Sequence, residues 1–200
     1  MKGYTTRQEI ENYLLITIDP SFYTQVNNWI TDIEAYIDNQ TGRNFKADTN
    51  ATKRVYDGDN TSSILIDDCV EVTEVKIGTD TPLNKDESGI EDDYFLYPQN
   101  ALADKRPFNR IKLVGGYFPK YPMQTNQITA KWGYSVDVPS DIKQAATILV
   151  AGIINYSWNA EGEVKSMNIG SYAVTYKDEK QWQDFDRLVE TFKHYIKYNL

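Results

Sequence analysis

The sequence predicts an α+β fold, mainly a helical bundle of about four helices with an inserted small β subdomain and an extended arm before the C-terminal helix. Three observations predict this class. Apolar residues recur at helical spacing near both ends of the chain. The middle of the chain shows short β-type runs separated by turn residues. A segment near the C-terminal end alternates between apolar and polar residues, as an extended chain does.

The 200-residue length fits a single domain that covers residues 1–200. We expect residues 1–45 and 138–200 to form the helical core. Residues 50–136 form the inserted β subdomain in this prediction, and residues 161–177 form the extended arm or loop.

Two helices are predicted before residue 45. The first begins at a capping box, in which the side chains of Thr6 and Glu9 satisfy backbone N–H groups at the helix start. Asp19-Pro20 starts the second helix, because Asp accepts from free N–H groups and Pro has none to satisfy. Gly42 suits a left-handed cap at its end. The apolar stripe of this second helix comprises Phe22, Val26, Trp29, Ile30, Ile33 and Ile37.

The middle region consists of short β-type runs. Turn residues separate them, among them Asp57-Gly58-Asp59-Asn60, Asp67-Asp68 and Gly115-Gly116. We therefore expect a compact β subdomain between the helices. The runs are residues 55–56, 64–66, 70–77, 94–97, 111–114 and 128–134.

The helical pattern returns at Ser140, which suits the N-cap of a helix that is apolar on more than one face. The arm follows this helix. Asp178-Glu179-Lys180-Gln181 then has the spacing of a capping box for a final amphipathic helix that runs to the C-terminus. The residues assigned to core packing across the helices are Trp29, Ile33, Leu149, Ile153, Trp182 and Phe185.

The composition excludes several classes of protein. Hydrophobic residues make up 40% and aromatic residues 13% of the chain, which excludes an intrinsically disordered chain. The longest apolar stretch has about ten positions, too few to cross a membrane, so no membrane contact is expected. The first residues lead directly into a polar helical pattern, so no signal peptide is expected.

The formal net charge of −8 is unevenly distributed. Residues 1–100 carry 8 basic and 19 acidic side chains, a net charge of −11, whereas residues 101–200 carry 13 and 10, a net charge of +3. A basic stretch, residues 105–120, is interleaved with aromatic residues. It can bind single-stranded nucleic acid, or it can be the outer face of a sheet that buries its aromatic rings. Its members, with one adjoining tyrosine, are Lys105, Arg106, Phe108, Arg110, Lys112, Tyr117, Phe118, Lys120 and Tyr121.

Residues that support common enzyme chemistry are scarce. Cys69 is the single cysteine and His194 the single histidine, which excludes an internal disulfide and a Cys–His zinc site. Cys69 lies in an apolar strand pattern, which favours a buried structural thiol. The pairs Asp67-Asp68 and Asp92-Asp93 favour turns or solvated edges, because adjacent strand residues point to opposite faces. We therefore predict no catalytic residue, no metal, no cofactor and no enzyme activity.

Four stretches, together spanning residues 22–176, have a recognisable order and spacing. They are Trp29, Glu34, Tyr36 and Ile37 before Thr41-Gly42-Arg43-Asn44-Phe45; Ser63 to Val70 with Val72 and Val75; Trp132-Gly133-Tyr134 before Val138-Pro139-Ser140-Asp141 and on to Ala146; and Val164 to Tyr176. In these stretches the chain resembles the phage head–tail connector proteins, also called adaptor or head-completion proteins.

The resemblance implies a connector domain without catalysis. Family members assemble as a ring, usually twelve-fold, below the portal vertex of a DNA-filled capsid, where they extend the DNA channel and offer a docking surface to the next neck or tail component. The expected partners are the portal protein, a downstream neck or tail-completion protein, further copies of the chain, and packaged DNA in transient, non-specific contact. The expected location is the neck of the virion, after synthesis in the host cytoplasm.

The arm is too apolar for a free loop. It could add a strand to a neighbouring subunit or to the portal, or it could fold back as a local hairpin on its own subunit. If the ring exists, acidic groups that face the channel would keep DNA binding weak, and the basic stretch would face a protein neighbour or the outside. The residues assigned to the subunit or portal interface are Met167, Ile169, Tyr172, Val174, Tyr176, Lys193 and Tyr198.

Three other classes of protein remain open. One is a different tail or baseplate interaction protein with the same helix-plus-β pattern. The second is a carbohydrate-binding module, which the tyrosine and tryptophan residues of the β region suggest. The third is an acid–base hydrolase, which would need two carboxylates to converge in a cleft and ranks last.

Overall fold

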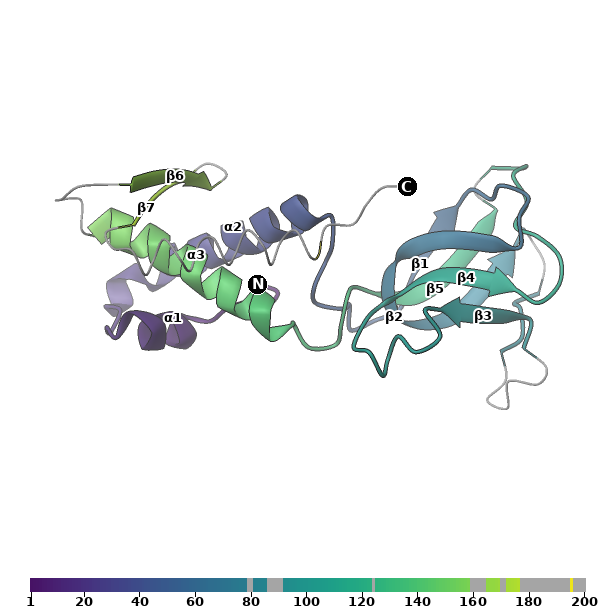
Figure 1. Ribbon diagram of the computed structural model, residues 1–200, viewed down its shortest axis with the longest axis horizontal. Coiled ribbons are helices and arrows are strands. Elements are labelled where there is room, and N and C mark those ends of the chain that lie inside the picture. The colour runs from purple at the N-terminus through teal and green to yellow at the C-terminus, as the bar shows by residue number, and fades with distance from the viewer. Residues whose placement is uncertain are drawn as a thin grey trace. The chain divides into compact units, whose positions relative to one another are not determined.

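The computed structural model describes residues 1–78, 81–85, 92–123, 125–158, 165–169, 172–176 and 195. The chain divides into two compact units (Figure 1). The helical unit comprises Met1–Arg43 and Val138–Leu200, and the β unit comprises Asn44–Asp137. Within the described residues, no helix has both the length and the apolar character that a membrane span requires.

The described helices are α1 (Arg7–Leu14), the short 3-10 helix η1 (Pro20–Phe22), α2 (Tyr23–Thr41) and α3 (Ser140–Trp158), of which α1 and α2 both contact α3. The predicted capping box of α1 is confirmed: the Thr6 hydroxyl accepts from the N–H of Glu9 at 3.2 Å, and the Glu9 carboxylate accepts from the N–H of Thr6 at 2.7 Å. The predicted left-handed cap of α2 is also confirmed, since Gly42 has a φ of 66°. Local sequence therefore sets the ends of these helices.

The core of the helical unit lies around α3. Every residue from 145 to 154 is buried, as the apolar residues on several faces of this segment require. Small side chains such as Ala145 and Ala146 let neighbouring helices approach closely. Four residues that the sequence assigns to core packing are buried in this unit, namely Trp29, Ile33, Leu149 and Ile153.

Polar side chains of α2 and α3 hold the N-terminal segment in place. The carboxylate of Glu34, which is 2% exposed, accepts from the backbone N–H groups of Lys2 at 2.7 Å, Gly3 at 2.8 Å and Tyr4 at 3.1 Å. One turn later on α2, Asp38 accepts from the Tyr4 hydroxyl at 2.5 Å and forms an ion pair with Lys2. These bonds fix the path of the chain that leads into α1.

The arm forms a two-stranded antiparallel sheet of β6 (Lys165–Ile169) and β7 (Tyr172–Tyr176) (Figure 1). Met167 is opposite Val174 and Ile169 is opposite Tyr172 in the register, so these four residues share one face of the hairpin. β7 contacts α3 of the same chain. The arm therefore forms a local hairpin within its own chain.

Tyr195 is the single described residue of the predicted C-terminal helix. Its backbone carbonyl accepts from the Arg43 guanidinium at 2.7 Å, and its hydroxyl donates to the carboxylate of Asp141 at 3.0 Å. Tyr195 thereby contacts both the segment after α2 and the first turn of α3. The remaining C-terminal residues with predicted roles lie outside the described part of the chain, namely Trp182, Phe185, Lys193 and Tyr198.

The β unit is a five-stranded antiparallel sheet in the order β1-β5-β2-β4-β3. Its strands are β1 (Thr52–Tyr56), β2 (Ser63–Ile77), β3 (Tyr94–Tyr97), β4 (Phe108–Leu113) and β5 (Asn126–Trp132). The first half of β2 pairs with β4 and the second half with β5, with register shifts around Cys69. One face of the sheet encloses a core of its own, which includes Ile66, Cys69, Val75, Ile111, Phe118, Ile128 and Trp132.

Gly133, which directly follows β5, has a φ of +135° that side chains rarely permit. A Cβ atom at Gly133 would lie 2.5 Å from the Cα atom of Ala47. Its N–H also donates to the carbonyl of Asp68 at 2.7 Å. The Trp132-Gly133-Tyr134 motif therefore marks a place where two backbone segments touch.

The predicted fold class is wrong. The described part of the chain has three α-helices and a five-stranded antiparallel sheet, so it is not a four-helix bundle with a small inserted β subdomain. The misleading feature is Asp67-Asp68, which resembles a turn but lies inside the long strand β2, where Asp68 is buried. The two predicted runs 64–66 and 70–77 are thus one bent strand that joins both halves of a full sheet.

We predict that Glu34→Ala lowers the free energy of unfolding by about 2 to 4 kcal/mol, because backbone donors of the N-terminal segment lose their acceptor. Glu34→Gln keeps one acceptor oxygen and should cost about half as much. Urea denaturation followed by circular dichroism measures both changes, and amide hydrogen exchange at Tyr4 should accelerate. Gln25→Ala, an exposed change on the same helix, should alter stability by less than about 0.5 kcal/mol. Equal losses for Glu34→Ala and Gln25→Ala would contradict this account.

Candidate functional site

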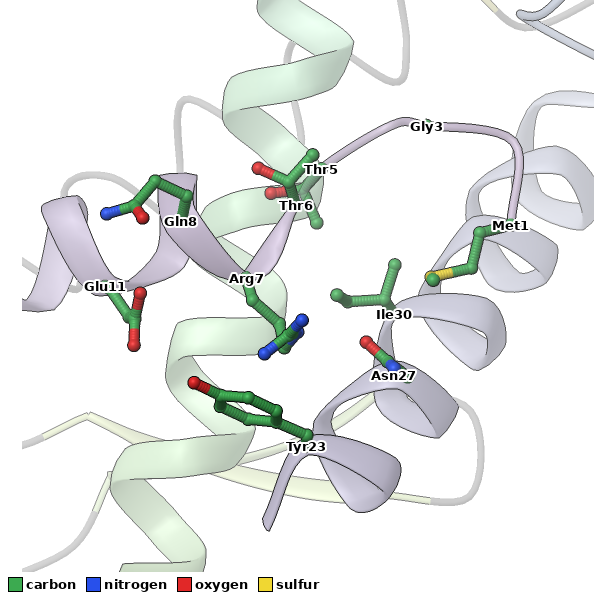
Figure 2. A pocket seen from close by; sticks show the side chains of 10 residues that line it. All are labelled: Met1, Gly3, Thr5, Thr6, Arg7, Gln8, Glu11, Tyr23, Asn27 and Ile30. Carbon is green, nitrogen blue, oxygen red and sulfur yellow. The ribbon is translucent and has the colours of Figure 1, made fainter. Parts of the chain in front are cut away.

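The helical unit contains a hollow of about 570 Å³ beside the start of α1, which we call the Arg7 hollow (Figure 2). Two segments build it. Residues 1–11 supply one side, and three residues at helical spacing on one face of α2 supply the other. The lining residues are Met1, Gly3, Thr5, Thr6, Arg7, Gln8, Glu11, Tyr23, Asn27 and Ile30.

Arg7 and Tyr23 contact each other in the hollow. The Arg7 guanidinium carbon lies 3.6 Å from the centre of the Tyr23 ring, a close cation–π contact. Figure 2 shows the Arg7 side chain extending from α1 toward this ring on α2. Both residues are half-buried. The contact therefore holds a positive charge in a defined place inside the hollow.

A second candidate surface lies on the outer face of the β unit. Arg110 and Lys112 point outward from β4, and neither forms an ion pair with a residue that the structure describes. In the register, Arg110 lies between Leu65 of β2 and Tyr97 of β3, and Lys112 lies opposite Phe95 of β3. Leu65 is 53% exposed and Phe95 is 38% exposed. This face thus offers two cations flanked by apolar and aromatic side chains.

The aromatic residues of the basic stretch are divided between core and surface. Phe108 and Phe118 are buried, whereas Tyr117 and Tyr121 are exposed. The two buried phenylalanine rings fit the interpretation of a sheet that buries its aromatic residues. Trp132 is buried in the β unit, so its ring is not a platform for a sugar.

Candidate catalytic groups in the β unit have structural partners. Asp67 accepts from the Arg54 guanidinium at 2.7 Å and from the Tyr56 hydroxyl at 2.9 Å. Burial is the main reason that the pKa of Tyr56 is raised. Among the described residues, no three His, Cys, Asp or Glu side chains are grouped where they could hold a metal ion.

Cys69 is fully buried, which confirms its interpretation as a buried thiol. Burial, with a smaller contribution from the charge of Asp68, raises the pKa of the Cys69 thiol to about 12. A thiol with this pKa stays protonated at neutral pH and is a poor nucleophile.

The interface residues assigned from the sequence are only partly placed. Met167, Ile169, Tyr172, Val174 and Tyr176 all belong to the β6–β7 hairpin. Sequence reasoning missed the Arg7–Tyr23 pair altogether. The two residues are 16 positions apart and belong to different helices, so neither helical nor strand periodicity relates them. The pair arises because α1 and α2 both pack on α3, which brings Arg7 close to Tyr23.

Two solved structures share the fold of this chain. A chain titled as the neck of an empty GTA particle, computed with C6 symmetry, matches with a TM-score of 0.58 and 13% identity over 100% of this chain and 93% of that chain. A chain titled as the neck of a native GTA particle, computed with C12 symmetry, matches with a TM-score of 0.53 and 16% identity over 96% of this chain and 88% of that chain. No protein-family model matches the sequence, and no curated protein matches it significantly.

We predict that Ellman's reagent leaves Cys69 unmodified in the folded protein at pH 8. With a pKa of about 12, roughly one thiol in ten thousand is ionised at this pH, against about a quarter in an unfolded chain with an ordinary pKa of about 8.5. Absorbance at 412 nm should rise at least a hundred times more slowly in buffer than in guanidinium chloride. Equal rates in the two solvents would contradict the buried placement of Cys69.

The same shift gives a pH dependence of stability. Because the folded pKa of Cys69 lies above the unfolded pKa, ionisation in the unfolded chain lowers the free energy of unfolding as pH rises from about 8.5 toward 12. Between pH 8 and 9, below the ordinary tyrosine pKa of about 10, the stability of Cys69→Ala measured by urea denaturation should fall less than that of the unmodified protein.

Proposed function

We propose that this chain is a non-enzymatic structural protein of a phage-like particle, a subunit of the neck that connects a DNA-filled head to a tail. The likeness of its fold, over almost its whole length, to chains from the necks of GTA particles carries this proposal. GTA particles are phage-like gene transfer agents. The resemblance of the sequence to head–tail connector proteins supports the same conclusion independently of the fold.

The proposed assembly is a twelve-fold ring below the portal. The two similar neck structures were computed with C6 and C12 symmetry, which supports a ring made of several copies. In this arrangement the chain acts as an adaptor between the portal protein and the next neck or tail-completion protein. The ring extends the channel through which the packaged genome passes.

The distribution of charge supports a channel that does not retain DNA. The first hundred residues carry a net charge of −11 and would repel phosphate groups if they lined or rimmed the channel. The cations of the outer face of the β unit, Arg110 and Lys112, would then meet a protein neighbour or the outside. The chain would contact DNA transiently and without sequence preference.

The β6–β7 hairpin is proposed to supply contacts between subunits or with the portal. Its register gathers four apolar residues on one face, as such a contact requires. The interface residues in this proposal are Met167, Ile169, Tyr172, Val174 and Tyr176, together with Lys193 and Tyr198 near the C-terminus.

We predict that the chain mixed with its portal protein forms a ring stacked on the portal, visible by negative-stain electron microscopy and then by cryo-EM. The portal supplies the symmetry that aligns the copies, whose like charges would otherwise oppose association. The chain alone, at the same concentration, is the control. Absence of any complex with the portal would overturn the proposed function, and a ring with Arg110 facing the channel would overturn the proposed charge arrangement.

We predict that Met167→Ser combined with Val174→Ser abolishes ring formation on the portal while the protein stays folded. These two residues are opposite each other on the apolar face of the hairpin. Ser166→Ala combined with Thr175→Ala changes the neighbouring opposite pair and should leave assembly intact. Circular dichroism and electron microscopy measure folding and assembly. If the first variant unfolds, its apolar face packs within the subunit, and the interface assignment is wrong.

A further inference from the structure

The Arg7 hollow holds a guanidinium that forms no ion pair with a described residue. Of the ten lining side chains, all in the described part of the chain, Arg7 carries the one positive charge and Glu11 the one negative charge. The Glu11 carboxylate accepts a hydrogen bond from the backbone N–H of Ile18 at 2.8 Å, which stabilises the loop after α1. Arg7 forms no ion pair with any residue that the structure describes.

The orientation of Arg7 suits an incoming anion. The guanidinium lies over the face of the Tyr23 ring, which leaves the N–H groups around its edge available for hydrogen bonds. The contact with Tyr23 also restricts the side chain before any ligand arrives, so binding costs less conformational entropy. Figure 2 shows the guanidinium within the hollow, between α1 and α2.

The rest of the lining favours a peptide over other anions. Asn27 and Gln8 provide amide groups, Thr6 provides a hydroxyl, and Ile30 and Met1 provide apolar surface. A single guanidinium matches a single carboxylate with two parallel hydrogen bonds. A nucleic acid would instead require a row of cations along its phosphates, and no second cationic side chain lines the hollow.

We propose that the Arg7 hollow binds an acidic side chain, Asp or Glu, of a peptide segment from another protein chain. Arg7 pairs with the carboxylate, and Tyr23 acts as a positioning residue that holds the guanidinium in place. The hollow is complete within the helical unit, so the inference does not depend on a place below the portal. A failure of ring formation and a failure of peptide binding would therefore be separate results.

The first test uses the unmodified protein and two neutral-ended peptides, acetyl-Ala-Glu-Ala-amide and acetyl-Ala-Gln-Ala-amide, which differ only in the carboxylate. Nitrogen-15 NMR follows the Nε–H signal of Arg7 and the backbone signals of Thr6 and Gln8 during titration. The glutamate peptide should bind about tenfold more tightly than the glutamine peptide, because it supplies the charged acceptor. Equal shifts with both peptides, or none with either, would overturn the proposal.

Variants then assign the effect to Arg7. Arg7→Gln should weaken binding of the glutamate peptide by about tenfold or more, and Tyr23→Leu should weaken it by a smaller factor because the guanidinium loses its platform. Arg110→Gln removes the same charge from the β unit and should leave binding unchanged. A purely structural Arg7–Tyr23 contact predicts no difference between the two peptides in any variant.

Inorganic phosphate provides the remaining comparison. If phosphate shifts the Arg7 and Thr6 signals at lower concentration than the glutamate peptide does, the hollow is a phosphate site and the proposal of a peptide carboxylate is overturned. Weaker shifts with phosphate than with the glutamate peptide support it.

Discussion

The helical unit depends on one carboxylate that folding removes from water. Burying a charge costs several kcal/mol unless hydrogen bonds replace its hydration, and Glu34 obtains them from three consecutive backbone N–H groups. The N-terminal segment therefore cannot leave α2 without breaking these three hydrogen bonds together. Because this segment leads directly into α1, it sets where α1 begins and how it meets α2. The placement of Arg7 over Tyr23 follows from that geometry.

The β unit depends on a different constraint, the bend in β2. β2 lies between β4 and β5 in the sheet, pairs with β4 through its first half and with β5 through its second half, and shifts its register on both sides of Cys69. Asp68 is buried at the bend, and its carbonyl accepts from the N–H of Gly133. A glycine at that position permits the backbone after β5 to approach closely enough. The bend and the glycine thus act together to join the two halves of the sheet.

Features that depend on neighbouring residues could be predicted from the sequence. The capping box at Thr6 and the left-handed Gly42 are local, and both predictions are confirmed. Features that depend on residues distant in the sequence could not be predicted from it. Asp67-Asp68 has the composition of a turn, yet tertiary pairing with β4 and β5 keeps it within a strand. The Arg7 hollow has no sequence signature, because it exists only where α1 and α2 meet.

The burial of the single cysteine has a practical consequence for the study of this protein. A cysteine introduced at an exposed position would be the one thiol that reacts under native conditions, so no background substitution would be needed. A fluorophore at position 110 would report on the outer face of the β unit, and one at position 25 on the helical unit. The native chain is therefore already suited to single-site labelling, by which the order of assembly could be followed in real time.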